Sequence, residues 1–253
     1  MEVKVTITPR EKEFDTLLKV FPPKPSNKFL PDWYKKQKFT TLPNTWANYE
    51  ENEIGVKTTK NCPAIRDFLT KGITIPAWSD FILVKDGDNI QWNLTIQNSL
   101  SLENKPHLKV GEHSLEQTTP LELNNIANYG TLKLTSPYYF KTPPGYGLHF
   151  YDPFYNHRNN IRLLPGMVET DIWHEVNLPF EFVNDINNVD QERIYLKAGD
   201  PLFVVVPYLK ETKINLDLKN YDSDFIDLHN ENVVINNSIS NNWHEFKKIK
   251  DEK

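Results

Sequence analysis

The acidic residues Glu169 and Asp171 form the part of this chain whose residue types and spacing could most directly carry out chemistry. They lie two positions apart in the segment from Met167 to Asp171, which we predict to be a strand. Side chains two apart point to the same face of a strand, about 7 Å from each other. Two carboxylates at that separation suit general acid and base catalysis, or the binding of a divalent cation. The alternative is a charged strand edge that deters pairing with other strands.

A second group of polar residues lies in the aromatic segment before this pair. His149, Asp152 and His157 follow one another with two and four residues between them, and two imidazoles with a carboxylate can bind iron or zinc. The spacing differs from the His-x-Asp of the usual iron oxygenases, and a chain with a single cysteine offers no regular four-ligand set. We therefore expect no bound metal and no cofactor. The alternative for His149 is a hydrogen bond within the core or a groove.

Two arginines of the same region, Arg158 and Arg162, could bind a carboxylate or phosphate of a ligand through two hydrogen bonds each. The alternative is an ion pair with Glu169 or Asp171 across a hairpin. Tyrosine and tryptophan are enriched on binding surfaces, so aromatic residues of this region join the candidate site. The candidate catalytic residues are Glu169 and Asp171, and the candidate binding residues are Tyr146, His149, Asp152, His157, Arg158, Arg162, Trp173 and His174.

The elements that must position these residues are predicted to be β-strands. Glycine and proline supply turn conformations, and β-branched or aromatic residues follow them, as in the segment from Gly199 to Val206. Short strands separated by turn residues favour an antiparallel sandwich or barrel over a parallel α/β sheet. We expect the segment from Gly145 to Tyr208 to form one central antiparallel sheet, with turns at Gly166, Pro179 and Gly199.

The chain divides into three parts by composition. Residues 1–60 open with the alternating strand pattern of residues 3–8 and continue as an arm rich in proline and aromatic residues. Residues 61–210 form the β-rich core, with a helix over 64–71 and a hairpin joining residues 81–84 to 90–96. Residues 211–253 are polar and end in a helix over 240–249.

Charge and hydropathy exclude two classes of partner. The net charge of −5 over 253 residues gives no general attraction to nucleic acid or to anionic lipid. The longest apolar runs have the length of a strand and fall short of the roughly 20 residues that span a bilayer. The chain begins with charge and without an apolar signal core. We expect a cytoplasmic protein, or one in the host cytoplasm or virion if a phage encodes it.

Several segments resemble a family of proteins found in large tailed marine cyanophages and in some bacteria, for which no activity is established. The resemblance extends over about residues 33–210. It rests on four segments of the sequence, which are 62–76, 138–146, 166–171 and 197–202.

The core also resembles the dUTPase family, whose fold is a β-clip. Gly166, Val168, Glu169 and Asp171 match its Gly-x-Ile-Asp-x-Asp-Tyr hairpin, and the turn over 197–200 matches its Lys-x-Gly-Asp turn. The segment 144–146 matches the Pro-Gly-Tyr that opens its central strand. The resemblance implies a β-clip fold in the core. Together with the strand, arm and helix patterns of the sequence, it leads us to expect a mainly β fold, an antiparallel β-sandwich or β-clip-like barrel with an extended N-terminal arm and a C-terminal helix.

This sequence departs from the dUTPase pattern where the chemistry of that family lies. Glu169 stands at the position of the aspartate that activates water, and Ile172 stands at the position of the tyrosine that stacks under the sugar. Trp173 is one residue too late, on the opposite face of a strand. The phosphate-binding segment is absent, and no glycine follows Gly199 to bring backbone amides close to a triphosphate.

Two hypotheses of function follow, and the sequence leaves open whether the protein is an enzyme. The first is a phage-type or accessory protein that acts by surface binding or assembly, through a protein partner or self-association. The alternative is a small-molecule-binding protein or a β-clip hydrolase that uses the face from Tyr146 to His174. The two differ in whether His149, Arg162 and the acidic pair converge in one pocket.

Overall fold

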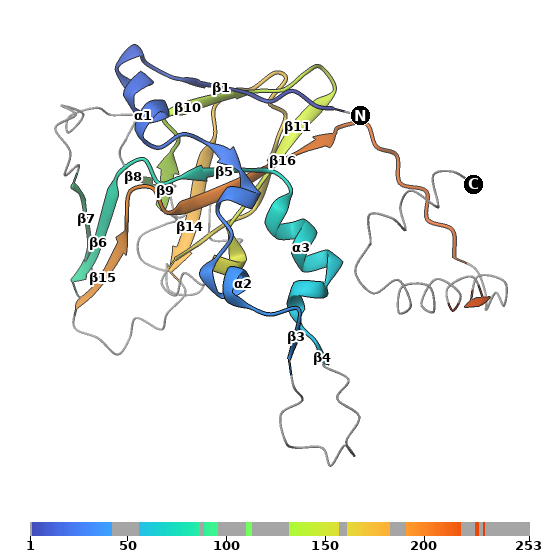
Figure 1. The fold of residues 1–253 in the computed structure, drawn as a ribbon. Coiled ribbons are helices and arrows are strands. Elements are labelled where there is room, and N and C mark those ends of the chain that lie inside the picture. Colours follow the sequence, from blue (N-terminus) through green and yellow to red (C-terminus); the bar gives the residue numbers. More distant parts are fainter. Residues whose placement is uncertain are drawn as a thin grey trace. The chain divides into compact units, whose positions relative to one another are not determined.

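The structure, a computed structural model, describes residues 2–41, 56–86, 89–95, 110–112, 132–156, 161–182, 191–218, 226–227 and 230. The chain divides into two compact units, Met1–Pro31 with Leu69–Glu211 and Asp32–Phe68 with Thr212–Lys253. The larger unit consists mainly of antiparallel strands, and the described part of the smaller unit holds short helices and one strand pair (Figure 1). The boundaries at 60 and 210 expected from composition stay a prediction.

A five-stranded antiparallel sheet carries the acidic pair of residues. Its order is β13 (Gly166–Val168), β11 (Tyr146–Tyr151), β16 (Pro201–Leu209), β5 (Ile73–Pro76) and β2 (Lys24–Pro25). The consecutive residues from Leu202 to Val205 of β16 are all buried, as expected for a central strand that is covered on both faces. The strand β13 lies at one edge of this sheet beside β11.

The other strands of the larger unit form three further groups. A four-stranded sheet has the order β12 (Ile161–Leu163), β14 (Asn177–Phe182), β9 (Leu132–Thr135) and β8 (Val110–Glu112). A three-stranded sheet has the order β15 (Gln191–Leu196), β6 (Asp80–Asp86) and β7 (Asn89–Thr95). The strand β1 (Thr6–Pro9) pairs with β10 (Tyr138–Lys141). Buried residues alternate along β9, which packs one face on the core.

One hydrophobic core joins these groups of strands. It includes residues from β5, β6, β9, β10, β11, β12, β14, β15 and β16. At its centre Phe140 contacts Phe150 and Phe203, with ring centroids 5.7 and 6.1 Å away. These edge-on aromatic contacts connect β10 with β11 and β16, the two strands that adjoin the acidic pair.

Short helices connect the strands, and the helix predicted over 64–71 is confirmed as α3 (Pro63–Thr70). Proline at its first position costs no hydrogen bond, and Gly72, with φ of +99°, follows its end. The remaining helical segments are η1 (Lys12–Phe14), α1 (Asp15–Val20), η2 (Ser26–Lys28), α2 (Asp32–Lys36), η3 (Thr59–Asn61) and η6 (Phe154–Asn156).

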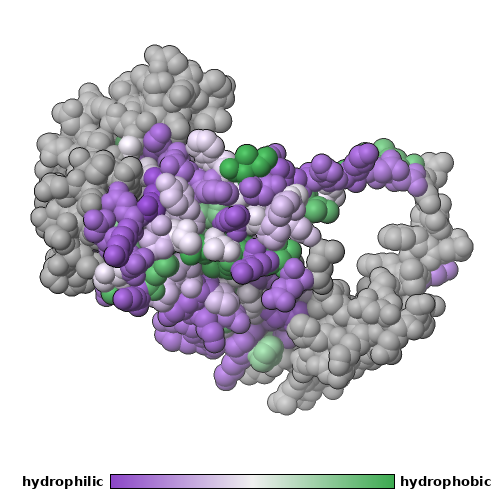
Figure 2. Space-filling view, turned by 90° about the horizontal axis from the view of Figure 1, so that it is seen from above, coloured by the Kyte–Doolittle hydropathy of each residue, from purple (hydrophilic) through white to green (hydrophobic). Residues whose placement is uncertain are grey.

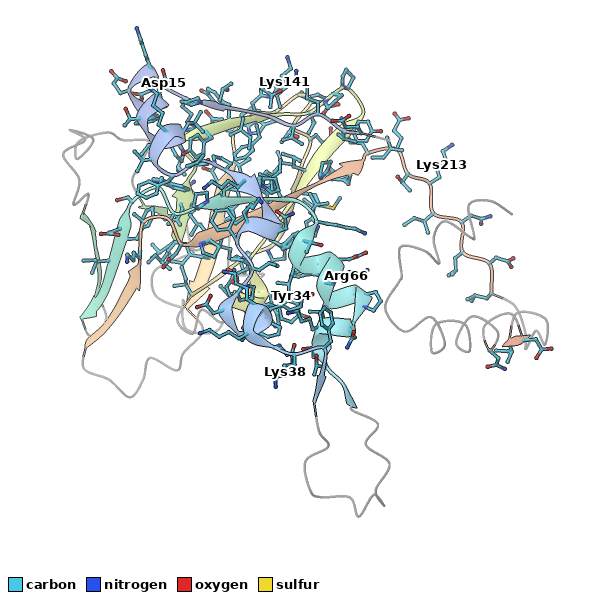
Figure 3. All side chains as sticks on the ribbon, viewed as in Figure 1. Asp15, Tyr34, Lys38, Arg66, Lys141 and Lys213 are labelled. Atoms are coloured by element: carbon cyan, nitrogen blue, oxygen red, sulfur yellow. The ribbon has the colours of Figure 1, made fainter. Side chains whose placement is uncertain are left out.

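In the smaller unit, β3 (Thr40–Thr41) pairs with β4 (Val56–Lys57), and Lys60 contacts the end of α2 and the residue before β3. Its ammonium donates to the carbonyls of Lys35 and Gln37, 3.3 and 3.0 Å away, near the end of α2. It also lies over the rings of Tyr34 and Phe39. Figure 3 labels Tyr34, on α2, and Lys38, which follows this helix. The positive charge thus stabilises the carbonyl end of a short helix.

The predictions of a mainly antiparallel β fold and of the hairpin are confirmed, the hairpin as β6 paired with β7. None of the sheets in the described ranges closes into a barrel. The helix predicted over 240–249 lies outside the described residues.

The prediction that residues 145–208 form one sheet is wrong, because their strands divide among three sheets. Gly166 and Pro179 lie within β13 and β14 and not in turns. Pro165 lies between β12 and β13 and has no backbone N–H to donate to a neighbouring strand. The strands on its two sides belong to different sheets, with β12 before it pairing with β14 and β13 after it pairing with β11.

Phe140→Ala should destabilise the protein by about 3–5 kcal/mol, because it leaves a cavity at the meeting point of β10, β11 and β16. Denaturant unfolding would measure the loss. Phe154→Ala is the matched control, since Phe154 is exposed and its loss should change stability by less than about 0.5 kcal/mol. Equal effects of the two substitutions would contradict this position of the core.

Candidate functional site

Glu169 and Asp171 lie on a tight turn that follows β13, and not on a strand as predicted. The amide of Thr170 donates to the carbonyl of Val168, and the amides of Ile172 and Trp173 both donate to the carbonyl of Glu169, at 2.8–3.0 Å. The backbone donors are thus used within the turn and not in a ladder with another strand. The expectation that both carboxylates share one strand face is therefore wrong.

The turn nevertheless brings the two carboxylates together around Lys210, which follows β16. The ammonium of Lys210 lies 2.7 Å from Glu169 Oε2 and 3.1 Å from Asp171 Oδ1. The side chain of Asp171 is 9% exposed and that of Lys210 17%, whereas that of Glu169 is 58% exposed. Asp171 and Lys210 thus form the inner part of this ion-pair network, and Glu169 covers it from the solvent side.

Asp171 also binds the backbone at the beginning of β11. Its Oδ2 accepts the amide hydrogen of Gly145 at 2.9 Å, and the amide of Lys210 donates to the Gly145 carbonyl at 2.9 Å. Gly145 has φ of +83°, a conformation that suits glycine. We call Gly145, Glu169, Asp171 and Lys210 the Asp171 corner. It connects the end of β16, the turn after β13 and the turn before β11.

Buried threonines support the corner from inside. The hydroxyl of Thr142 donates to the carbonyl of Tyr146 at 2.6 Å and lies 2.8 Å from the hydroxyl of Thr170. Because a hydroxyl has one hydrogen, Thr170 must be the donor in the contact between the two threonines. His174 Nδ1 lies 3.0 Å from the carbonyl of Thr170. That acceptor places the proton of His174 on Nδ1 and fixes the orientation of the ring.

The contacts within the Asp171 corner favour the charged forms of Asp171 and Lys210. The hydrogen bond from the Gly145 amide, with the Lys210 ammonium, lowers the pKa of Asp171 below its ordinary value. The hydrogen bond to Glu169, with Asp171, raises the pKa of Lys210 above its ordinary value. Both groups are therefore charged throughout the neutral pH range. Neither is suited to give up or take a proton near neutral pH, which general acid and base catalysis requires.

Of the other candidate residues, His149 and Asp152 make contacts elsewhere in the sheets. His149 is half-buried on β11, opposite Met167 of β13, with its ring 5.3 Å from that of Tyr151. Asp152 accepts the amide hydrogen of Leu163 at 3.1 Å and so belongs to the β12 side.

Two further candidates lie at separate places in the sheets. Tyr146 begins β11, and its amide donates to the carbonyl of Pro143. Arg162 is exposed on β12, in the four-stranded sheet. His157 and Arg158 lie outside the described residues.

Three large apolar side chains near the corner are exposed. Met167 of β13 is 60% exposed, and Ile172 and Trp173 of the following turn are 72% and 61% exposed. We call these three residues the β13 patch. Among these three residues the sequence indicated Trp173 alone as a candidate. Nothing in the residues around Lys210 indicates its contact with the turn.

The described residues offer no group of three histidine, cysteine, aspartate or glutamate side chains that could hold a metal ion. In the same part of the chain, no helix is both long and apolar enough to cross a bilayer.

No protein-family model matches this chain, and no curated protein matches it in sequence. Among solved structures it is distantly similar to a mutant of the dUTPase of Staphylococcus bacteriophage 80alpha. The TM-score is 0.34 and the identity 8%, over 87% of this chain and 98% of that chain. The description of that structure states that phage dUTPases control transfer of virulence genes by a proto-oncogenic G protein-like mechanism. A similarity of this degree carries no argument about this protein, and the resemblance to the cyanophage family stays a prediction.

Asp171→Asn should remove the part of the stability that depends on ionised Asp171. A carboxyl whose pKa is lowered on folding stabilises the protein above its unfolded-state pKa, here near 3.8. That stability is lost as the pH falls through the lowered value. The wild type should therefore melt at a higher temperature than the variant at neutral pH, and the difference should disappear in strong acid.

Glu169→Gln serves as the control for this pH series, because the Glu169 side chain is largely exposed and its ion pair should contribute less. Melting curves from acid to neutral pH would compare the three proteins. A wild type and an Asp171→Asn variant with the same acid dependence would contradict the role of Asp171.

Proposed function

We propose that this protein acts by binding another protein through the β13 patch, and that the acidic pair has a structural role. The observation that carries the proposal is the use of Asp171 and Lys210 in the corner, beside apolar side chains that remain exposed. The carboxylate of Asp171 already accepts a backbone amide and an ammonium. A carboxylate in that position has little capacity left to activate water.

The composition and position of the patch support a protein partner. Methionine and tryptophan are enriched where proteins bind one another, and exposed apolar side chains close together mark such surfaces. The strand β13 is short and lies at the edge of its sheet, with Met167 outward and Val168 against the core. An extended segment of a partner could pair with the open side of β13 and cover Met167.

A photo-reactive amino acid placed at Ile172 should form a covalent adduct with a partner protein in extract of the cells that naturally contain this chain. The matched control is the same amino acid at Phe154, which is 61% exposed and apolar but lies on η6. Trp173→Ser should lower the yield of the adduct severalfold, because large aromatic residues contribute most at interfaces. Denaturing gels and mass spectrometry would measure the yield.

The alternative, a small-molecule enzyme or binding protein, predicts a different result. A thermal-shift screen of nucleotides, sugars and 2-oxo acids should then give a ligand that stabilises the wild type but not the Glu169→Gln/Asp171→Asn double variant. Such a ligand would contradict the proposal, as would equal adduct yields at Ile172 and Phe154.

A further inference from the structure

The segment that follows β16, residues 212–218, is exposed along its whole length. It reads Thr-Lys-Ile-Asn-Leu-Asp-Leu, and the structure assigns it to no helix and no strand. Ile214, Leu216 and Leu218 are 91%, 75% and 83% exposed. The space-filling view shows hydrophobic and hydrophilic side chains interspersed on the described part of the surface (Figure 2). Apolar residues at alternate positions form one face of a strand when the segment is extended.

The residues between the apolar ones carry a self-complementary pattern of charge. Lys213, Asn215 and Asp217 lie on the opposite face of such a strand. When two copies of the segment run antiparallel and are centred on Asn215, Lys213 of each copy lies opposite Asp217 of the other. In the same register Ile214 lies opposite Leu216 in both halves, and Leu218 lies opposite Thr212 at each end. Opposite charges and apolar pairs directly across from each other both stabilise a sheet.

Other registers lose this match. A parallel pairing in register places Lys213 opposite Lys213 and Asp217 opposite Asp217, which is unfavourable. An antiparallel pairing centred on Ile214 brings Asp217 opposite Glu211, another pair of like charges. One centred on Leu216 leaves Asp217 opposite Asn215. A shift by a single residue places apolar side chains opposite polar ones.

We propose that residues 212–218 pair antiparallel with the same residues of a second copy, centred on Asn215, to form a two-fold symmetric dimer. A symmetric contact of this kind uses the same surface on both copies and closes on itself. A two-stranded ribbon of this length is only marginally stable in water, so the dimer should form with rising protein concentration. The proposal concerns a surface other than the β13 patch and does not depend on the proposed function.

The charge pattern allows a sharp test with the full chain. Lys213 lies on the exposed segment, with its side chain directed away from the chain (Figure 3). Lys213→Asp and Asp217→Lys each place like charges opposite each other twice in the dimer. Each variant should therefore weaken association by about tenfold or more. The double variant Lys213→Asp/Asp217→Lys restores both pairs with reversed polarity and should associate like the wild type.

A mixture of the two single variants should form a heterodimer, because each then supplies the charges that the other lacks. Lys141→Asp makes the same charge change at an exposed position on β10 and should leave association unchanged. Sedimentation velocity from micromolar to several hundred micromolar protein would measure the dissociation constants. The expected result is a wild-type dimer that is lost in each single variant and restored in the double variant and in the mixture.

Three results would overturn the proposal. The first is a wild type that stays monomeric at every concentration. The second is a dimer that neither single charge variant weakens, and the third is a single-variant loss that the double variant and the mixture do not restore. A dimer that is lost with Trp173→Ser but not with Lys213→Asp would place the contact at the β13 patch instead.

Discussion

The arrangement of the strands around the acidic pair depends on one carboxylate, that of Asp171. It accepts the amide hydrogen of Gly145 before β11 and contacts the ammonium of Lys210 after β16, while its own residue follows β13. These are three neighbouring strands of one sheet. Loss of the carboxylate leaves the Gly145 amide without its acceptor and the Lys210 ammonium with Glu169 alone, which costs more than the loss of an exposed ion pair.

The sequence was informative where structure is decided by neighbouring residues. Pro63 and Gly72 bracket α3, and the alternation of apolar residues predicts β6 and β7 as a hairpin, because these signals act within a few residues. The pairing of strands far apart in the sequence was not predictable in this way. Ile161 and Leu163 are buried in the four-stranded sheet, whereas Gly166 begins an edge strand of another sheet only three residues later.

The same distinction applies to the candidate site. The spacing of Glu169 and Asp171 predicted two carboxylates on one strand face, whereas the two residues lie in a turn and both contact Lys210. Lys210 is distant in sequence, and its contact follows from the pairing of β16 with β11, which no local pattern encodes. The exposure of Met167 and Ile172 was also not predictable from the sequence, because large apolar residues in a β-rich sequence are expected in the core.

The structural coupling between Asp171 and Lys210 is tested most directly by a double-mutant cycle. The proteins compared are the wild type, Asp171→Asn, Lys210→Met and the double variant, each unfolded with urea at neutral pH and in acid. We expect the double variant to lose much less stability than the sum of the single losses at neutral pH, and this difference to shrink in acid. Additive losses at neutral pH would contradict the coupling.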